Sequence, residues 1–527
     1  MNQRSVLSTV SGCGCCLSRR RFLEFSAGCA ACAALGGAAQ RALAQPAAAP
    51  SKMRLRILYS LHGPVQDRPD WPNKGFDFRP VMQKIESVLR EGCPDFEFLP
   101  AMATGPEEAA KIVEQDQAEG VDGYIVYQMN CWNRVVQSAA ATGKPTLYLD
   151  FQFAGSGGFL VYTSSFLRQN ATNVAFVASS NWDDHVAAVR CFRLVKEGKG
   201  VGDFAAAVAK VRRERTPAPG DMTYLADAAA VLSVEETLRR LKETKILAVG
   251  GGWPGIIEPL QKELGIPVES VAFEELNAAW EKADKDEAAA VADMWKKTAA
   301  VIEDVSPETL QVSAAMYLAE KAVLQAHNAN AITINCLGGF YGGHIHAYPC
   351  LGFHQLNNEG LIGACECDVR STATMVLMTT MTQGRPGFIS DPVVDTAKRQ
   401  IIYAHCVASN KPFGPQGPAN PFQILTHSED RQGASVRSLM PEGYLTTTLE
   451  IAPERKTILF HQAKSVGNSL EDRACRTKLC GEPVGDIEKL FREWDQWGWH
   501  RVTFYGDFKE PVFALADALG WQVLQEA

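Results

Sequence analysis

Residues 54–61 read RLRILYSL and residues 79–92 read RPVMQKIESVLREG, two stretches that space their apolar residues differently. The first is a short apolar run, typical of a buried strand, and the second repeats apolar residues every three or four positions, typical of an amphipathic helix. The alternation continues with a strand, a helix and two strands at Phe96–Leu99, Glu107–Glu119, Val121–Gln128 and Pro145–Asp150. Strands that alternate with helices form βαβ units, so residues 53–170 are predicted to be a doubly wound α/β domain around a parallel sheet.

A second α/β domain is expected over residues 171–330. An apolar strand at Ile246–Val249 runs into Gly250–Gly255, which reads GGGWPG. This run lacks the G-x-G-x-x-G spacing and its proline interrupts a helix start, so it predicts a tight turn rather than a phosphate cradle. Long helical patterns follow at Glu274–Glu303 and Pro307–His327.

The remaining residues, 331–527, have shorter apolar runs, many glycines and prolines, and most of the histidines. A loop rich in proline and glycine at Lys411–Pro421 precedes three strand-like runs, at Gln423–His427, Tyr444–Ile451 and Thr457–Phe460. We therefore expect an α+β domain with antiparallel sheet. The predicted fold class is α/β, with two doubly wound parallel-sheet domains followed by this C-terminal α+β domain.

The N-terminal segment is expected to be an export signal. Ser18–Leu23 reads SRRRFL, the pattern read by the twin-arginine translocase, and an apolar run rich in alanine and glycine follows it. Ala42–Ala44 then supplies a small-x-small cleavage site. The apolar run of about 15 residues is shorter than the roughly 20 needed to cross a bilayer. Residues 1–44 are thus expected to be removed during export to the periplasm, and residues 45–52 to form a linker.

The composition is that of a globular protein, because 46% of the 527 residues are hydrophobic and 21% are charged. The formal net charge is −8 and no basic block follows the leader, which disfavours nucleic acid and anionic membrane as partners. No later run is apolar enough for stable membrane insertion. Five of the fifteen cysteines lie in the leader, and the other ten are too scattered for a disulfide scaffold. Cys475 and Cys480 are close enough to pair, and their pairing stays open.

The densest candidate site is Ala364–Met375, which reads ACECDVRSTATM and falls between a strand pattern and a helix pattern. Alternate residues of a strand face the same side, so Glu366 and Asp368 would point into one site. The cysteines at 365 and 367 would face the opposite layer. Two adjacent carboxylates repel unless a cation or a proton lies between them, which favours a metal site or a split pair of pKa values. The alternative is a solvated strand end that caps the next helix.

Three other places contain residue types that could serve a site. His344 and His346 can present both imidazoles to one metal on an extended segment, but a loop of hydrogen-bonded histidines is the alternative. Trp497–Arg501 reads WGWHR, and tryptophans beside a polar residue suit a sugar ring as well as an ordinary core. His405 ends an apolar run and is expected to be structural.

Four segments together resemble the L-fucose isomerase-like sugar isomerases, which share a three-domain plan with the arabinose isomerases. The first is a long helix leading to a strand that ends in Asn-Cys, at Leu310–Cys336, and the second is a stretch with ACE-x-D, at Pro349–Asp391. The third is a strand after a Pro-Gly pattern, at Met440–Ile451, and the fourth is a C-terminal strand carrying a histidine, at Gly498–Gly520. The resemblance covers most of the chain from about Arg54 onward. Its most specific part is ACE-x-D.

The resemblance implies an aldose–ketose isomerase that acts on a monosaccharide or derivative with a divalent ion, commonly Mn2+, with Fe2+ or Zn2+ as other options. A related step that proceeds by enolisation, such as epimerisation or elimination, stays open. The ion would hold two adjacent sugar oxygens while carboxylates move a proton between neighbouring carbons through an enediol. By position, Asp368 would be a metal ligand and acid/base group, His500 the C-terminal ligand, and Glu366 a supporting catalytic or metal-binding group. Trp499 and Arg370 would contact the sugar. The family also implies a ring-shaped homo-oligomer.

The segment Asn335–Cys350 departs from the family, because it contains no aspartate or glutamate where the family has an acidic ligand. His344 or His346 is expected to fill that place, or else the isomerase reaction has been lost. The competing function is a non-catalytic periplasmic sugar-binding protein, which metal content would distinguish from an enzyme. If one ion binds both side chains, Asp368 and His500 should lie within about 6 Å of each other although they are far apart in the sequence.

Overall fold

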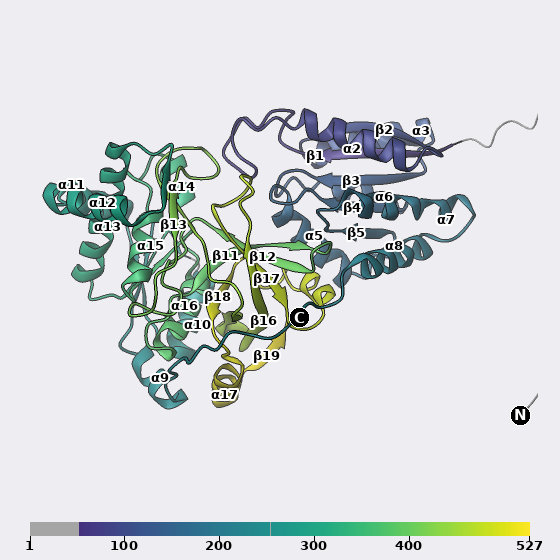
Figure 1. Ribbon diagram of the computed structural model, residues 1–527. Helices are drawn as coiled ribbons and strands as arrows, with labels where there is room; N and C mark the ends of the chain where they lie inside the picture. The colour runs from purple at the N-terminus through teal and green to yellow at the C-terminus, as the bar shows by residue number, and fades with distance from the viewer. Residues whose placement is uncertain (1–51, 253) are drawn as a thin grey trace, which may run out of the picture. The chain divides into compact units, whose positions relative to one another are not determined.

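The computed structural model describes residues 52–252 and 254–527 (Figure 1). The expected twin-arginine leader, its cleavage site and the linker up to residue 51 lie outside the described residues. Residues Lys52–Ala527 form one compact unit. Within the described ranges, no helix combines the length and the apolar character that a bilayer crossing requires.

The first region is a five-stranded sheet with the order β2-β1-β3-β4-β5, in which all neighbours are parallel. Its strands are β1 (Met53–Ser60), β2 (Phe96–Ala103), β3 (Gly123–Gln128), β4 (Thr146–Asp150) and β5 (Val174–Val177). Its helices are α2 (Arg79–Gly92), α3 (Pro106–Glu119), α4 (Val136–Ala140), α5 (Ser156–Arg168), α6 (Trp182–Arg190), α7 (Phe192–Lys196) and α8 (Val201–Arg215). The strands and helices predicted up to residue 150 are confirmed. β5 pairs with β4, so this sheet extends beyond residue 170.

The first strand, β1, is apolar almost throughout because both of its faces are covered. Leu55 and Ile57 face the core under α2, α6 and α8, while Leu58 faces the core on the opposite side of the sheet. A strand buried on both faces must supply apolar side chains to both. Since all five strands are parallel, the loops after β1, β2 and β3 emerge together at the carboxyl ends of the strands.

The second region is a four-stranded parallel sheet with the order β10-β9-β6-β7. Its strands are β6 (Ile246–Val249), β7 (Val268–Val271), β9 (Ala331–Ile334) and β10 (Ile362–Ala364). Its helices are α9 (Val234–Leu241), α10 (Pro254–Leu264), α11 (Phe273–Glu281), α12 (Lys285–Thr298), α13 (Pro307–Ala326), α14 (Cys336–Tyr341), α15 (Cys350–Asn358) and α16 (Val369–Met381). β9 and β10, which lie after residue 330, thus complete this sheet and not the C-terminal one.

Two local predictions for this region need correction. The single helix expected over Glu274–Glu303 is wrong, because the chain breaks before Asp284, whose side chain caps α12 by accepting two backbone N–H groups. The tight turn at Gly250 is confirmed by a φ of 70°. Its proline does not prevent a helix, however, since α10 begins at Pro254, and proline suits the first helical position.

The third region is a seven-stranded sheet with the order β15-β18-β11-β12-β17-β16-β19. Its strands are β11 (Phe388–Asp395), β12 (Gln400–His405), β15 (Leu445–Ala452), β16 (Thr457–Asn468), β17 (Thr477–Pro483), β18 (Arg501–Tyr505) and β19 (Gln522–Gln525). β15 also pairs with β16, so the sheet curls back on itself like a barrel. Only the β16–β19 pair is parallel among these strands, which confirms the predicted antiparallel character.

Smaller elements surround this sheet. They are the three-stranded sheet β14-β13-β8, with β8 (Val301–Glu303), β13 (Phe422–Leu425) and β14 (Ser435–Ser438), the short 3-10 turns η1 (Pro453–Arg455) and η2 (Ile487–Phe491), and helix α17 (Lys509–Leu519). All ten cysteines of the described residues are free and buried, including Cys475 and Cys480.

Candidate functional site

Strand register in the seven-stranded sheet gathers three polar side chains. Asp391 of β11 lies opposite Ala404 of β12, the residue before His405. On the other edge of β11, Ser390 pairs with the first residue of β18, which directly follows His500. Neighbouring strands are only about 5 Å apart. The side chains of Asp391, His405 and His500 therefore meet at one end of these strands.

Glu366 joins these three side chains to make a cluster of two carboxylates and two imidazoles, in which one ligand atom from each residue lies within 4.8 Å of the others. His500 Nε2 is 3.1 Å from Asp391 Oδ1 and 3.6 Å from Glu366 Oε2. His405 Nε2 is 3.7 Å from Glu366 Oε1. Neither Nε2 makes a hydrogen bond within the described part of the chain. Carboxylate and imidazole ligands in this combination suit Mn2+, Fe2+ or Zn2+.

Charge explains why the cluster needs a cation or a proton. Burial acts to lower the pKa of His500, but Asp391, Glu366 and Asp368 raise it well above its usual value. Burial raises the pKa of Glu366 to about 8, against the opposing effect of the His500 charge. A metal ion bound here would take over the charge that these protons supply, so its binding releases protons.

Asp368 lies on the other side of His500 from Glu366. Its Oδ2 is 2.9 Å from His500 Nδ1, which confirms the expected proximity of the two residues. The same carboxylate is the N-cap of α16, and it accepts hydrogen bonds from the backbone N–H and the hydroxyl of Ser371, at 3.0 and 2.9 Å. Burial would raise the pKa of Asp368, but the His500 and Ser371 contacts lower it to about 2. A carboxylate that holds Nδ1 in this way directs Nε2 toward a ligand.

The backbone at residues 366–368 differs from the predicted strand end. β10 stops at Ala364, and Glu366 and Cys367 have φ angles of 62° and 52°, in the left-handed region. The two acids therefore share a site because the chain turns around the His500 ring, and not because alternate strand residues face one side.

A buried ion pair fixes the strand that follows His500. Arg501 Nη2 donates to Glu526 Oε1 at 2.7 Å, and both side chains are buried. The Arg501 Nη1 also donates to the carbonyl oxygen of His500 at 2.8 Å. Glu526 follows β19, which pairs with β16. The C-terminal strand thus holds the backbone that presents the imidazole.

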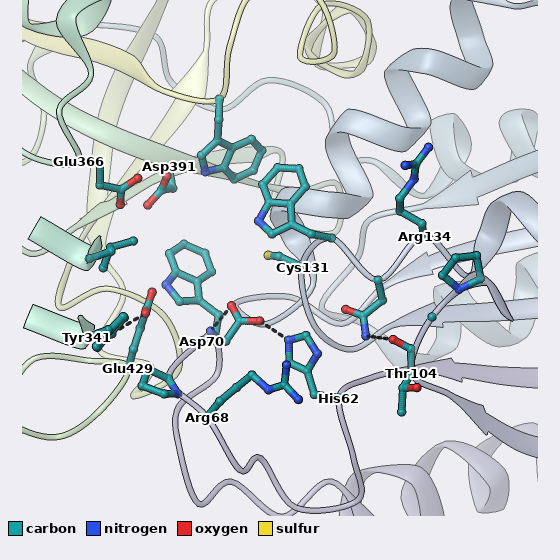
Figure 2. Close-up of a pocket in the computed structure, with 18 residues that line it drawn as sticks. His62, Arg68, Asp70, Thr104, Cys131, Arg134, Tyr341, Glu366, Asp391 and Glu429 are labelled. Atoms are coloured by element: carbon teal, nitrogen blue, oxygen red, sulfur yellow. Dashed lines mark hydrogen bonds and ion pairs between the residues drawn. The ribbon is translucent and has the colours of Figure 1, made fainter. Parts of the chain in front are cut away.

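The cluster opens onto a cavity of about 590 Å³ (Figure 2). The cavity is lined by His62, Arg68, Pro69, Asp70, Trp71, Thr104, Gly105, Pro106, Cys131, Trp132, Asn133, Arg134, Leu337, Tyr341, Glu366, Asp391, Glu429 and Trp499. Figure 2 shows Glu366 and Asp391 on one side of it and Arg134 and His62 on the other. The residues up to 134 come from the loops after β1, β2 and β3, at the carboxyl ends of the parallel strands.

Three tryptophans line the cavity between these groups: Trp71, Trp132 and Trp499. Trp132 and Trp499 pack edge to face with ring centroids 5.8 Å apart, and Trp132 is 51% exposed. Aromatic faces of this kind pack against the C–H faces of sugar rings. The structure thus places Trp499 where the resemblance expected a sugar contact, and adds Trp71 and Trp132.

Arg370 is not at the cavity, contrary to the expected sugar contact. Its guanidinium pairs with Glu454 and donates to the carbonyl oxygen of Trp497 at 2.7 Å. The side chain follows the N-cap of α16 and extends along the turn that precedes His500. It therefore holds that turn and has no access to a ligand in the cavity.

His344 and His346 are also absent from the cavity lining and the cluster, so the expectation that one of them replaces the missing acid is wrong. The His344 ring stacks on Phe273, with centroids 5.7 Å apart. His346 packs against Trp280 and lies 3.6 Å from Glu281. After α14 the chain turns toward α11, which carries both histidines away. The candidate cluster with Glu366 and His500 instead contains Asp391 and His405.

Glu429 is a cavity residue that sequence reasoning missed. It lies in the loop between β13 and β14, and Tyr341 donates its hydroxyl to Glu429 Oε2 at 2.7 Å. Burial raises the pKa of Glu429 to about 8, with His427 opposing this shift and Asp70 adding to it. A carboxyl group that titrates near neutral pH can both take up and release a proton.

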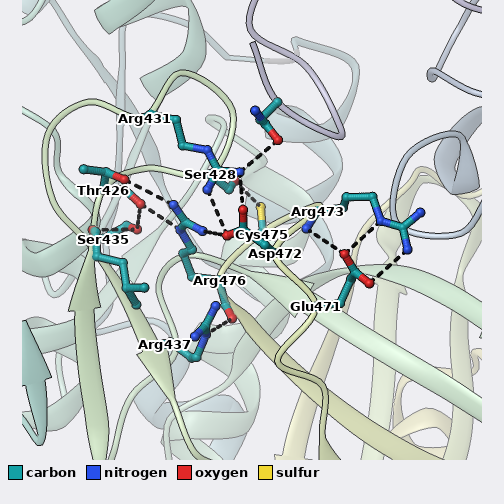
Figure 3. Close-up of polar contacts among 12 residues, drawn as sticks. Thr426, Ser428, Arg431, Ser435, Arg437, Glu471, Asp472, Arg473, Cys475 and Arg476 are labelled. Carbon is teal, nitrogen blue, oxygen red and sulfur yellow. Dashed lines mark hydrogen bonds and ion pairs between the residues drawn. The ribbon is translucent and has the colours of Figure 1, made fainter. Parts of the chain in front are cut away.

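An arginine network anchors the loop that carries Glu429 (Figure 3). Arg431 donates to both oxygens of Asp472, at 3.0 and 2.7 Å, and to Asn73 Oδ1 at 2.9 Å. Arg476 donates to the same Asp472 at 2.6 Å and to the carbonyl of Thr426 at 2.8 Å. The Glu429 carbonyl also accepts from the backbone N–H of Lys74 at 2.7 Å. These bonds join the loop to the segment after β1 that carries Asp70 and Trp71.

Comparison with known proteins finds sugar isomerases that are similar to this chain at low sequence identity. No protein-family model matches the chain. A sulfoquinovose isomerase from Clostridium sp. (strain MSTE9) is 24% identical over 315 residues, which cover 57% of this chain and 69% of that protein. A sulfoquinovose isomerase from Priestia aryabhattai is 24% identical over 184 residues, 34% of this chain and 41% of that protein. The chain is thus similar to sugar isomerases.

Solved structures give no closer guide. A carbohydrate transporter from Acidothermus cellulolyticus 11B in complex with myo-inositol is 10% identical over 56% of this chain and 79% of that chain, with a TM-score of 0.17. A sugar-binding protein of a sugar ABC transporter from Bacillus halodurans is 10% identical over 73% of this chain and 97% of that chain, also with a TM-score of 0.17. Similarity at this TM-score carries no conclusion on fold or function.

Proposed function

We propose that this chain is a metal-dependent sugar isomerase that interconverts an aldose and a ketose. The cluster of two carboxylates and two imidazoles around His500 carries the proposal, because it faces a cavity lined by tryptophans. The similarity to sulfoquinovose isomerases supports it.

Glu366, Asp391, His405 and His500 would hold the ion. Their donor set and the unpartnered Nε2 atoms of His405 and His500 fit a divalent metal such as Mn2+, Fe2+ or Zn2+. When bound, such an ion stabilises negative charge on two neighbouring sugar oxygens. Asp368 would act as a positioning residue, since its carboxylate is already engaged by His500 and Ser371.

Glu429 would transfer the proton between carbons. Its Oε2 is occupied by the Tyr341 hydroxyl, which leaves Oε1 free to take the proton from C2 of the aldose and return it to C1. The pKa of about 8 allows both steps near neutral pH. Trp71, Trp132 and Trp499 would pack on the sugar and keep water from the reacting carbons.

An isotope experiment tests this function. The purified protein is supplied with Mn2+, its metal content is measured, and it is incubated with candidate aldoses in deuterium oxide. We expect one ion per chain and deuterium at C1 of the ketose, because the transferred proton exchanges with solvent. Isomerisation by chelator-treated protein at the same rate would contradict the proposal.

The second candidate is a non-catalytic sugar-binding protein that uses the same cavity. The three tryptophans favour it, since they would hold a sugar without any chemistry. A protein that binds sugar tightly, holds no stoichiometric metal and incorporates no deuterium would support this function in place of the first.

The substrate is proposed to carry an anionic substituent. The relatives are named as acting on sulfoquinovose, a sugar with a sulfonate. Arg68 and Arg134 line the cavity. A guanidinium that contacts such an anion contributes about 1.5–3 kcal/mol. Arg68→Ala or Arg134→Ala should therefore raise KM for sulfoquinovose by roughly 10- to 100-fold and leave KM for the neutral sugar glucose unchanged. An equal effect on both sugars would contradict this substrate class.

Export to the periplasm through the twin-arginine pathway is also proposed, on the pattern at Ser18–Leu23. Replacing Arg19 and Arg20 by lysine should leave an uncleaved precursor in the cytoplasm. Normal accumulation of a processed form that begins near Gln45 would contradict it.

A further inference from the structure

Two cysteines lie side by side behind the wall of the cavity. Cys336 begins α14 directly after β9, and Cys365 directly follows β10. These two strands are parallel neighbours, so the residues at their carboxyl ends lie close together. The Sγ atoms of Cys336 and Cys365 are 3.1 Å apart. Both side chains are buried, at 1% and 4% exposure.

The Sγ atoms of Cys336 and Cys365 are already close to the distance of a disulfide bond. A disulfide bond is about 2.05 Å long, so the two sulfur atoms need to approach by about 1 Å. Cys336 Sγ also accepts a hydrogen bond of 3.4 Å from the backbone N–H of Glu366. Changes in the two side-chain torsions can move sulfur atoms by this amount.

The pair lies next to residues that line the cavity. Leu337 and Glu366, the chain neighbours of Cys336 and Cys365, both line the cavity. A peroxide in the cavity can therefore contact the chain neighbour of each cysteine. The cavity of about 590 Å³ easily admits a molecule of this size.

We propose that Cys336 and Cys365 form a disulfide when the protein meets a peroxide. One thiol loses its proton, and its thiolate attacks a peroxide oxygen to give a sulfenic acid and hydroxide, which takes up that proton to form water. The second thiol then attacks the sulfenic sulfur, forms the disulfide bond and displaces the oxygen as another water. Two thiols and one hydrogen peroxide thus yield one disulfide and two waters, and the two electrons pass from sulfur to oxygen. This inference does not depend on the proposed isomerase activity.

The cross-link would tie the start of α14 to the peptide that carries Glu366. Glu366 has a left-handed backbone and supplies one carboxylate of the cluster. Closing the loop between Cys336 and Cys365 removes freedom from the unfolded chain. We therefore expect the oxidised protein to unfold at a temperature a few degrees higher than the reduced protein.

Mass spectrometry tests the proposal on the full chain. The protein is treated with one to a few equivalents of hydrogen peroxide, denatured, labelled with N-ethylmaleimide and digested. We expect two thiols per chain to escape labelling, a peptide that links Cys336 to Cys365, and recovery of both thiols after reduction. Complete labelling, or oxidation to sulfonic acid without a cross-link, would overturn the proposal.

A second thiol pair serves as an internal control. Ser428 Oγ contacts the Sγ atoms of both Cys406 and Cys475, at 3.7 and 3.8 Å. A cross-link between Cys406 and Cys475 without one between Cys336 and Cys365 would overturn the assignment. Cys475→Ser should leave the linked peptide unchanged, whereas Cys365→Ser should abolish it. If Cys365→Ser does not fold, the peptide map of the unaltered protein still decides.

Discussion

The two walls of the cavity hold their polar groups in different ways. The C-terminal wall includes Glu366, Asp391, Glu429 and Trp499. The pKa values of Glu366 and Glu429 are raised by burial, and the Nε2 atoms of the adjacent His405 and His500 have no hydrogen-bond partner among the described residues. The N-terminal wall, made by the loops after β1, β2 and β3, presents groups that are paired or open to solvent. His62 Nε2 contacts Asp70 Oδ2 at 2.7 Å, and Trp132 is half exposed.

From this difference we infer that the C-terminal wall serves metal binding and catalysis, and that the N-terminal wall serves substrate recognition. A buried polar atom without a partner costs the folded state about 1–3 kcal/mol, so it is retained where a ligand supplies the partner. Groups that are already paired carry no such cost and can serve recognition. We therefore expect substitutions in the C-terminal wall to affect metal content and kcat, and substitutions in the N-terminal wall to affect KM.

The largest expected effect follows loss of a ligand in the C-terminal wall. Asp391→Asn keeps the shape of the side chain but removes its charge from the cluster. Asp368→Asn removes only the group that orients His500, a change that typically lowers metal affinity by about 10- to 100-fold. Asp391→Asn should lower metal affinity further than this, measured by metal analysis after dialysis. An Asp391→Asn protein with full metal content would show that the cluster is not the metal site.

The next largest effect is expected for Glu429, whose substitution should lower kcat without loss of metal. Glu429→Gln should lower kcat by about 10²- to 10⁴-fold, the usual contribution of an acid/base group, with metal content unchanged. A Glu429→Gln protein in which only KM changes would contradict the expectation that the C-terminal wall determines kcat.

The pH dependence identifies the same group. Because the base must be deprotonated, kcat/KM should rise with pH and level off above about 8, the pKa of Glu429. The Tyr341 hydroxyl lowers this pKa by stabilising the carboxylate. Tyr341→Phe should therefore move the midpoint of the profile to higher pH, and a shift to lower pH would rule out Glu429 as the base.

A smaller effect is expected at the N-terminal wall. Trp132→Ala removes one aromatic face from the cavity and leaves the cluster intact. KM should rise by roughly 5-fold, in line with about 1 kcal/mol of lost contact, while kcat and metal content stay close to those of the unaltered protein. Loss of metal in this variant would mean that the two walls do not act separately.

The smallest effect on the site is expected at Glu320 of α13, a buried acid whose two carboxylate oxygens have no hydrogen-bond partner in the described ranges. Burial raises its pKa well above the usual value. The folded state therefore retains a proton that the unfolded chain releases above about pH 4.5, so stability falls by up to about 1.4 kcal/mol per pH unit above that point.

Glu320→Gln removes this dependence. Its free energy of unfolding in urea should exceed that of the unaltered protein by an amount that grows from about pH 5 to about pH 8, with metal content and activity unchanged. A loss of activity would show that a buried acid outside the cavity also serves the site.

Much of the fold was predictable because its elements depend on local spacing. The helix predicted at Arg79–Gly92 has those bounds as α2 in the structure. The break before Asp284 was missed, since a capping aspartate within two helical runs does not interrupt their periodicity.

The site was less predictable because it depends on register between strands. Asp391 and His405 meet through the pairing of β11 with β12, and no feature near either residue encodes that pairing. The contact between Asp368 and His500 was expected only from the family resemblance. Glu429 carries no local pattern at all, since its raised pKa comes from tertiary burial.

The ion pair of Arg501 with Glu526 affects the order in which synthesis, folding and metal binding can occur. The ribosome makes the chain from its N-terminus, so the first parallel sheet is complete long before His500 and Glu526 are joined to it. The four candidate ligands come together only after the clamp on His500 has been synthesised. If these side chains bind an ion and the folded chain is exported, the chain carries the ion acquired where it was made. The metal supply of the compartment of synthesis, and not that of the destination, then determines which ion the protein holds.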